Sequence, residues 1–138
     1  MSSHPSPGTY LIQNRVFDGF GNALALTFTG ISQPVTVTII NGSTYTKQHW
    51  VIENHSSGLQ FIKPRNDQSL EAGNGNTIVT LPAGDYVWNI TQQGDYVITD
   101  GQDLINWGIK DVQHGAAVVP AEKSDDEKNR WIFQEIFV

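Results

Sequence analysis

The side chains best suited to metal binding or catalysis are present, but their spacing matches no reactive arrangement. His4, His49, His55 and His114 show no His-x-x-x-His or similar ligand spacing, and the chain has no cysteine to complete a zinc site. Serine, histidine and aspartate all occur, but the Gly-x-Ser-x-Gly turn that exposes a nucleophilic serine is absent. We therefore predict no metal site, no cofactor and no enzymatic activity.

Charge and length restrict the partners further. The 138 residues carry 8 basic and 14 acidic side chains, a net charge of −6, which disfavours binding to nucleic-acid phosphates and to anionic membranes. No apolar stretch is long enough to span a membrane, and the first residues lack the features of a secretory signal. The sequence thus predicts a single domain over residues 1–138, without nucleic-acid partner or membrane insertion, in the cytoplasm.

Alternating apolar and polar residues predict strands along the whole chain. Val35–Ile39 places apolar side chains on one face and hydroxyls on the other, the period of a half-buried strand. Turn signals such as Asn41-Gly42 and Pro82-Ala83-Gly84 separate the runs, and Gly73–Asn76 predicts a flexible hairpin. Further strands are predicted at Tyr10–Ile12, Leu24–Phe28, His49–Ile52, Leu59–Ile62, Thr77–Leu81, Tyr86–Ile90, Tyr96–Ile98, Leu104–Trp107, Ala117–Val119 and Trp131–Phe137.

Similar short sequence motifs recur at intervals of about 40 residues, which indicates internal repeats. Trp50, Trp88 and Trp131 each stand third in a polar-to-apolar strand and lie 38 and 43 residues apart. Each unit is too small to bury its apolar face alone, so three units must share one core. This pattern predicts an all-β fold, the β-trefoil, with repeats at roughly 8–54, 55–92 and 93–138 after a flexible segment 1–7.

The order and spacing of several short motifs point to a known family. They are Gly8–Val16, Leu24–Thr27, Pro34–Val37, Ala72–Asn74, Leu81–Pro82, Tyr86–Trp88 and Asn129–Trp131. Together they resemble the small ricin-B-like β-trefoil lectins of mushroom fruiting bodies, most closely the nematotoxic lectins that bind the fucosylated chitobiose core of N-glycans. The general Gln-x-Trp signature occurs once, at Gln48-His49-Trp50, so the galactose pockets of the wider superfamily are not implied.

The resemblance implies a non-enzymatic lectin of fungal defence that binds GlcNAc- and fucose-containing glycans or glycoproteins on target cell surfaces. In such a site Tyr86 or Trp88 would stack on the C–H face of a sugar, and Asp85 would accept hydroxyl protons. Because each contact is weak, function would require avidity from clustered glycans or a homodimer. The residues carried over are Leu81, Asp85, Tyr86, Val87 and Trp88 on the second unit, with His55 and Leu70 opposite.

Three positions depart from the family pattern. The family has an amide where this chain has Asp85, a tyrosine at His55 and a second tryptophan at Leu70. An amide can donate to a sugar oxygen, whereas an ionised carboxylate cannot. A glycan site at this place is therefore expected together with an altered glycan specificity.

Periodicity alone gives the tryptophans a different role. Trp50 and Trp131 occupy matching repeat positions and are predicted to close the core of the barrel. Trp88 occupies the same position, so without the resemblance it too would be assigned to the core.

A second hypothesis from another class is a β-trefoil protease inhibitor, since one fold can carry either function. An inhibitor needs a protruding loop that enters a protease cleft. Candidate loop tips are Gly19–Asn22 and Asn41–Thr44, neither of which offers a lone Arg or Lys for a trypsin-like pocket.

Overall fold

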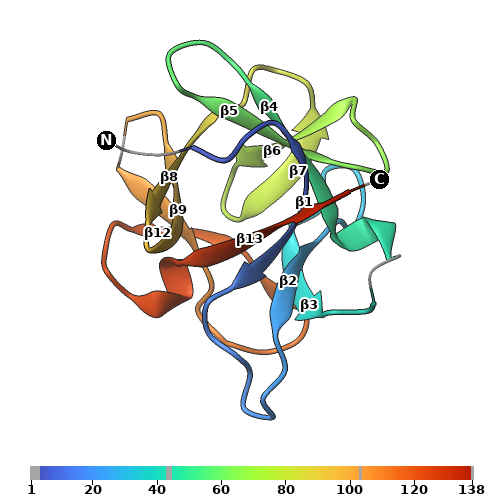
Figure 1. The fold of residues 1–138 in the computed structure, drawn as a ribbon, viewed down its shortest axis with the longest axis vertical. Helices are drawn as coiled ribbons and strands as arrows, with labels where there is room; N and C mark the ends of the chain where they lie inside the picture. The colour runs from blue at the N-terminus through green and yellow to red at the C-terminus, as the bar shows by residue number, and fades with distance from the viewer. Residues whose placement is uncertain (1–3, 43–44, 103, 138) are drawn as a thin grey trace.

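The computed structural model describes residues 4–42, 45–102 and 104–137, which form strands joined by turns and two short 3-10 helices (Figure 1). Among these residues no helix is long and apolar enough to cross a membrane. The predicted all-β class is confirmed. The elements are β1 (Gly8–Asn14), β2 (Leu24–Thr27), β3 (Thr36–Ile39), η1 (Thr46–Gln48), β4 (His49–Asn54), β5 (Gln60–Pro64), β6 (Leu70–Asn74), β7 (Ile78–Pro82), β8 (Trp88–Gln93), β9 (Asp95–Asp100), β10 (Ile105–Gly108), β11 (Ala116–Ala117), β12 (Val119–Glu122), η2 (Glu127–Asn129) and β13 (Trp131–Ile136).

The strands form a closed barrel. Around it β1 pairs with β4, β4 with β5, β5 with β8, β8 with β9, β9 with β13, and β13 returns to β1, all antiparallel. Six of the remaining strands form the hairpins β2–β3, β6–β7 and β10–β12, and the short β11 pairs with β3. One such hairpin belongs to each third of the chain, which is the arrangement of a β-trefoil.

A ring of backbone hydrogen bonds joins the three hairpins around the pseudo-threefold axis. The N–H of Val35 donates to the carbonyl of Ile78 at 2.8 Å, Ile78 donates to Val118 at 2.9 Å, and Val118 donates to Val35 at 2.9 Å. All three side chains are fully or almost fully buried. No single unit can complete this ring, so the three units depend on one another for folding.

Trp50 and Trp131 lie in the shared core, as predicted. Both are fully buried. The indole N–H of Trp50 donates to the Leu26 carbonyl at 2.9 Å, and that of Trp131 donates to the Trp107 carbonyl at 3.0 Å. Each tryptophan therefore ties its own barrel strand to the hairpin of its own unit, and the buried N–H has a partner.

The N-terminal segment, predicted to be flexible, makes contacts with the barrel. Residues 1–3 lie outside the described residues, but Pro5 is buried and its carbonyl accepts a bond from Gln60 Nε2 at 2.7 Å. His4 Nδ1 lies 2.7 Å from the Ile90 carbonyl, and Tyr10 Oη donates to the Ser6 carbonyl at 2.7 Å. These contacts join His4 to β8, Pro5 to β5 and Ser6 to β1, so these three residues are placed against the barrel.

Candidate glycan-binding site

The loop between β7 and β8 carries Asp85, Tyr86 and Val87. Its conformation depends on Glu71, a carboxylate in β6 that is only 3% exposed. Glu71 Oε1 accepts the backbone N–H of Gly84 at 3.2 Å and that of Tyr86 at 3.0 Å. Charge-assisted bonds of this kind are stronger than neutral ones. A buried acid on one strand therefore fixes the loop that follows the next strand.

Tyr86 is half-buried, and its ring rests on the hairpin beneath it. A methyl group built on Gly73 would lie 3.2 Å from Tyr86 Cγ and 2.9 Å from Leu81 Cδ1. One built on Gly84 would lie 3.0 Å from Tyr86 Cε2. Since any side chain at either glycine would collide with the ring, the two glycines make room for it. The residue as a whole is still partly exposed, so part of it can contact a ligand.

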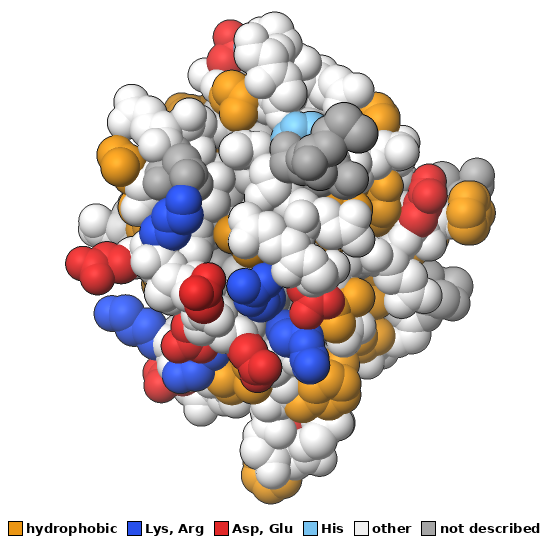
Figure 2. All heavy atoms as spheres, turned by 60° about the vertical axis from the view of Figure 1, so that its left-hand side comes forward, with side chains coloured by type: hydrophobic (Ala, Val, Ile, Leu, Met, Phe, Trp, Pro, Cys, Tyr) orange, Lys and Arg blue, Asp and Glu red, His pale blue; other side chains and the backbone are white. Residues whose placement is uncertain are grey.

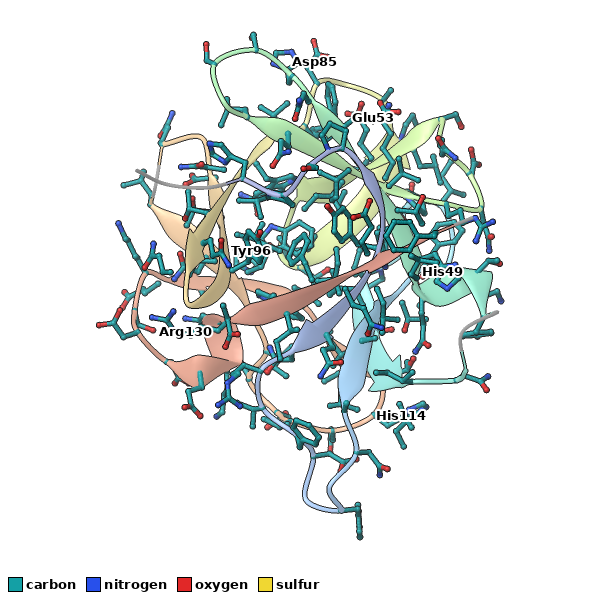
Figure 3. All side chains as sticks on the ribbon, viewed as in Figure 1. His49, Glu53, Asp85, Tyr96, His114 and Arg130 are labelled. Carbon is teal, nitrogen blue, oxygen red and sulfur yellow. The ribbon has the colours of Figure 1, made fainter. Side chains whose placement is uncertain are left out.

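Asp85 lies beside this ring and is exposed to solvent. Its backbone has φ of +60°, in the left-handed region that Asp and Asn tolerate better than most residues. Figure 3 places it at the edge of the barrel, away from the core. Its carboxylate is therefore accessible and can accept hydrogen bonds from a dissolved ligand.

Trp88 requires a correction of its predicted role. It is 2% exposed, its indole N–H donates to the Ala72 carbonyl at 2.8 Å, and its ring meets Trp107 edge to face at 5.1 Å. Trp50 and Trp131 make the same kind of bond in the other two units. The prediction that Trp88 stacks on sugar is wrong, because neither face of its ring reaches solvent. Periodicity alone had assigned it correctly.

The two residues predicted to lie opposite are placed differently from each other. Leu70 is 3% exposed and stands across from Pro82 in the β6–β7 hairpin. It is therefore buried beneath the site and does not offer a surface to a ligand. His55 is exposed on the turn between β4 and β5, with its ring edge to face with Phe61 at 5.2 Å. The structure brings Leu81, Asp85, Tyr86 and Val87 together on one loop and its flanking strand, with His55 two strands away.

Phe61 connects His55 to the loop. In β5, Gln60 stands opposite Trp88, the first residue of β8, and Phe61 and Val87 are the adjacent residues on the loop side of this pair. Lys63 Nζ lies 5.0 Å from the centre of the Phe61 ring and 2.7 Å from Glu53 Oε1. Sequence reasoning did not single out Phe61, although the alternation of β5 was visible and the structure leaves Phe61 partly exposed between the buried Gln60 and Ile62. We use "the ledge" for Leu81, Asp85, Tyr86 and Val87 with Phe61 and His55.

The loops proposed for protease inhibition give that hypothesis little support. Phe20 is 93% exposed at the tip between β1 and β2, a loop that protrudes at the bottom of Figure 1. This tip is a tight turn, since Gly21 N–H donates to the Asp18 carbonyl and the Asp18 carboxylate accepts from Phe20 and Asn22. It presents one side chain rather than an extended segment. In the second loop, Ser43 and Thr44 lie outside the described residues.

Solved structures with this arrangement define the class of fold. A mosquitocidal holotoxin matches with a TM-score of 0.84 at 15% identity, over 97% of this chain and 18% of its own. The designed three-fold symmetric protein ThreeFoil matches with a TM-score of 0.74 at 15% identity, over 94% and 99%. The ricin B-like lectin of Macrolepiota procera, solved in complex with lactose, matches with a TM-score of 0.75 at 14% identity, over 97% and 100%. The chain is a β-trefoil, and it spans about a fifth of the holotoxin.

The family follows from the sequence itself. A family model described as CCL2 lectin-like matches residues 8–131, nearly the whole barrel. The chain belongs to this family and is a carbohydrate-binding lectin. No relative is found among curated proteins.

Proposed function

We propose that the chain binds N-glycan-type oligosaccharides that contain GlcNAc and fucose, at the ledge and without altering them chemically. The observation that supports this most directly is the partly exposed Tyr86, whose backbone N–H is bound by Glu71 and which follows the exposed carboxylate of Asp85. An aromatic ring beside a hydrogen-bonding rim is the combination that a pyranose requires, because a sugar has a C–H face and hydroxyl edges. We further propose a role in fungal defence from the cytoplasm.

Each part of the ledge has a distinct task in this proposal. The exposed portion of Tyr86 stacks on the C–H face of one sugar ring, and Phe61 extends the apolar surface across β5. Asp85 accepts protons from sugar hydroxyls. Leu81 and Val87 contact the methyl group of fucose. The exposed His55 donates or accepts one hydrogen bond at the far rim.

The ledge is shallow, so the affinity for one oligosaccharide will be modest. Micromolar to millimolar dissociation constants, about −8 to −4 kcal/mol, are what a few stacked and hydrogen-bonded contacts supply. Binding to a cell surface then gains strength from clustered glycans or from a homodimer, because the second contact becomes intramolecular.

Replacing Tyr86 with alanine tests the position of the site. We expect binding of a fucosylated chitobiose glycan to weaken at least about tenfold, because the stacking surface is lost. Tyr86→Phe keeps the ring and should bind within about threefold of the wild type unless the hydroxyl contacts sugar. Isothermal titration calorimetry measures both, with thermal unfolding as the check of folding. A folded Tyr86→Ala protein with full affinity would place the site elsewhere.

Replacing Asp85 with asparagine tests the specificity. Asparagine tolerates the positive φ at this position, so the loop should keep its conformation. The new amide can donate to a sugar oxygen, and we expect binding to the fucosylated chitobiose core to strengthen about fivefold relative to other glycans. A glycan array compares the two proteins. Identical array profiles would show that this side chain does not touch the sugar.

A further inference from the structure

The three tryptophans establish which residues correspond among the three units. Trp50 pairs with Tyr10, Trp88 with Gln60 and Trp131 with Tyr96. Their indole N–H groups donate to the carbonyls of Leu26, Ala72 and Trp107, which are therefore equivalent. The residues that precede these three carbonyls are Ala25, Glu71 and Asn106, so Glu71 of the ledge has Asn106 as its counterpart in the third unit.

Asn106 differs from Glu71 in what its side chain contacts. It is 1% exposed, and its Nδ2 donates to the Ser124 carbonyl at a long 3.4 Å. Among the described residues its Oδ1 has no hydrogen-bond partner. In the second unit the corresponding carboxylate accepts two bonds from the loop before β8. A buried acceptor without a donor is costly and rare in native proteins, so Asn106 requires an explanation.

A hollow of about 320 Å³ adjoins Asn106. This volume is at the small end of the range known for ligand pockets, which suits a single sugar residue. Most of its lining is polar, with Val97 as the apolar exception. The other lining residues are Gln93, Thr99, Asn106, Lys123, Ser124, Asp125 and Arg130.

Arg130 and Asp125 provide charged groups at this hollow. Arg130 Nη1 donates to the Gln93 carbonyl at 2.9 Å, which fixes the guanidinium, and Nη2 lies 3.7 Å from the Asp125 carboxylate. Lys and Arg side chains gather among Asp and Glu side chains on the lower part of the face shown in Figure 2, the face formed by the left-hand side of Figure 1. With Lys123, the lining has two basic side chains and one acidic side chain, so it offers both donors and acceptors.

We propose that this hollow is a second carbohydrate site, which takes one neutral sugar residue. Asn106 Oδ1 is itself buried, so the amide must turn toward the hollow before a sugar hydroxyl or an acetamido N–H can supply the donor that it lacks, which a carboxylate cannot supply. Arg130 donates to sugar oxygens, and Thr99, Ser124 and Asp125 bond the remaining hydroxyls. This second site shares no residue with the ledge, so the test of one site does not depend on the test of the other.

Nuclear magnetic resonance titration of the labelled full chain tests this proposal. The probes are the methyl glycosides of glucose, galactose and N-acetylglucosamine, with methyl glucuronide as the acidic counterpart of the first. We expect at least one neutral glycoside to cause saturable shifts in the backbone amides of Thr99, Asn106 and Ser124, with a millimolar dissociation constant. The glucuronide should bind at least threefold more weakly than methyl glucoside.

Variants separate the two sites. Asn106→Val removes the buried amide and should weaken these shifts at least tenfold, whereas Tyr86→Ala should leave them unchanged. If Asn106→Val does not fold, Arg130→Met serves instead, with Arg65→Met as the matched control; Arg65 contacts His49, which lies on the opposite side of the barrel from Arg130 in Figure 3. The proposal is overturned if no neutral glycoside shifts these amides, if the folded variant binds as the wild type does, or if the glucuronide binds as tightly as methyl glucoside.

Discussion

Trp88→Ala is expected to lower the free energy of unfolding by about 3–5 kcal/mol, the usual cost of deleting a large buried aromatic side chain. The ring is almost wholly enclosed and meets Trp107 edge to face. Its loss leaves a cavity and also removes the donor to the Ala72 carbonyl. Since a domain of this size is stable by only about 5–15 kcal/mol, much of the protein would unfold on modest heating. Chemical denaturation followed by circular dichroism measures the change.

Two comparisons make this prediction specific. Trp50→Ala and Trp131→Ala should be destabilised to a similar degree, because the three indoles make equivalent bonds. Trp88→Phe retains most of the ring, and we expect a smaller loss of about 1–3 kcal/mol, mainly from the unpaired carbonyl. If Trp88→Ala unfolds at the wild-type denaturant concentration yet no longer binds glycan, the ring acts in recognition and its assignment to the core is mistaken.

Glu71→Leu should produce the next largest effect, on binding and stability together. The backbone N–H groups of Gly84 and Tyr86 lose their shared acceptor, and each buried donor left unpaired costs about 1–3 kcal/mol. Because both groups lie near the surface and water can reach them on rearrangement, we expect a total near the lower limit, about 2 kcal/mol. The loop then no longer holds the Tyr86 ring, and glycan affinity should fall at least about tenfold.

The matched control is Glu71→Gln, which keeps an acceptor oxygen at the same distance along the side chain. It should bind glycan within about threefold of the wild type, because the loop geometry needs an acceptor more than a charge. Calorimetry and denaturation report the two effects separately. Wild-type affinity in a folded Glu71→Leu protein would show that the loop holds its shape by other contacts.

The barrel could be predicted from the sequence because most of its strands are half-buried. Val35–Ile39 alternates strictly, and the structure places β3 at Thr36–Ile39. The strand β6 was missed. Leu70, Glu71, Ala72 and Gly73 are all buried, so no alternation marks this strand, and a glycine and an asparagine follow its apolar start. The hairpin predicted at Gly73–Asn76 is present, with Gly75 N–H donating to the Thr77 carbonyl at 3.0 Å, but Gly73 and Asn74 belong to β6.

The site was less accessible to sequence reasoning for two physical reasons. A strand over Tyr86–Ile90 would put Tyr86 and Trp88 on one side, but β8 begins only at Trp88 and Tyr86 lies in the preceding loop. The place of the Tyr86 ring depends on the two glycines that leave room for it, Gly73 and Gly84. Glu71 is distant in sequence from the loop that it holds. In the sequence, Glu71 is recognisable only as an acidic residue between the apolar Leu70 and Ala72. The N–H groups that it binds, those of Gly84 and Tyr86, are brought to it by the tertiary fold.

The burial of all four tryptophans decides how ligand binding can be observed. Trp50, Trp88, Trp107 and Trp131 are at most 2% exposed. Their fluorescence should therefore be blue-shifted and resistant to acrylamide quenching in the native protein. Tryptophan emission should therefore change when the protein unfolds. It should not change when an oligosaccharide binds at the protein surface. A flat fluorescence titration of this lectin would consequently carry no information about its affinity for sugars.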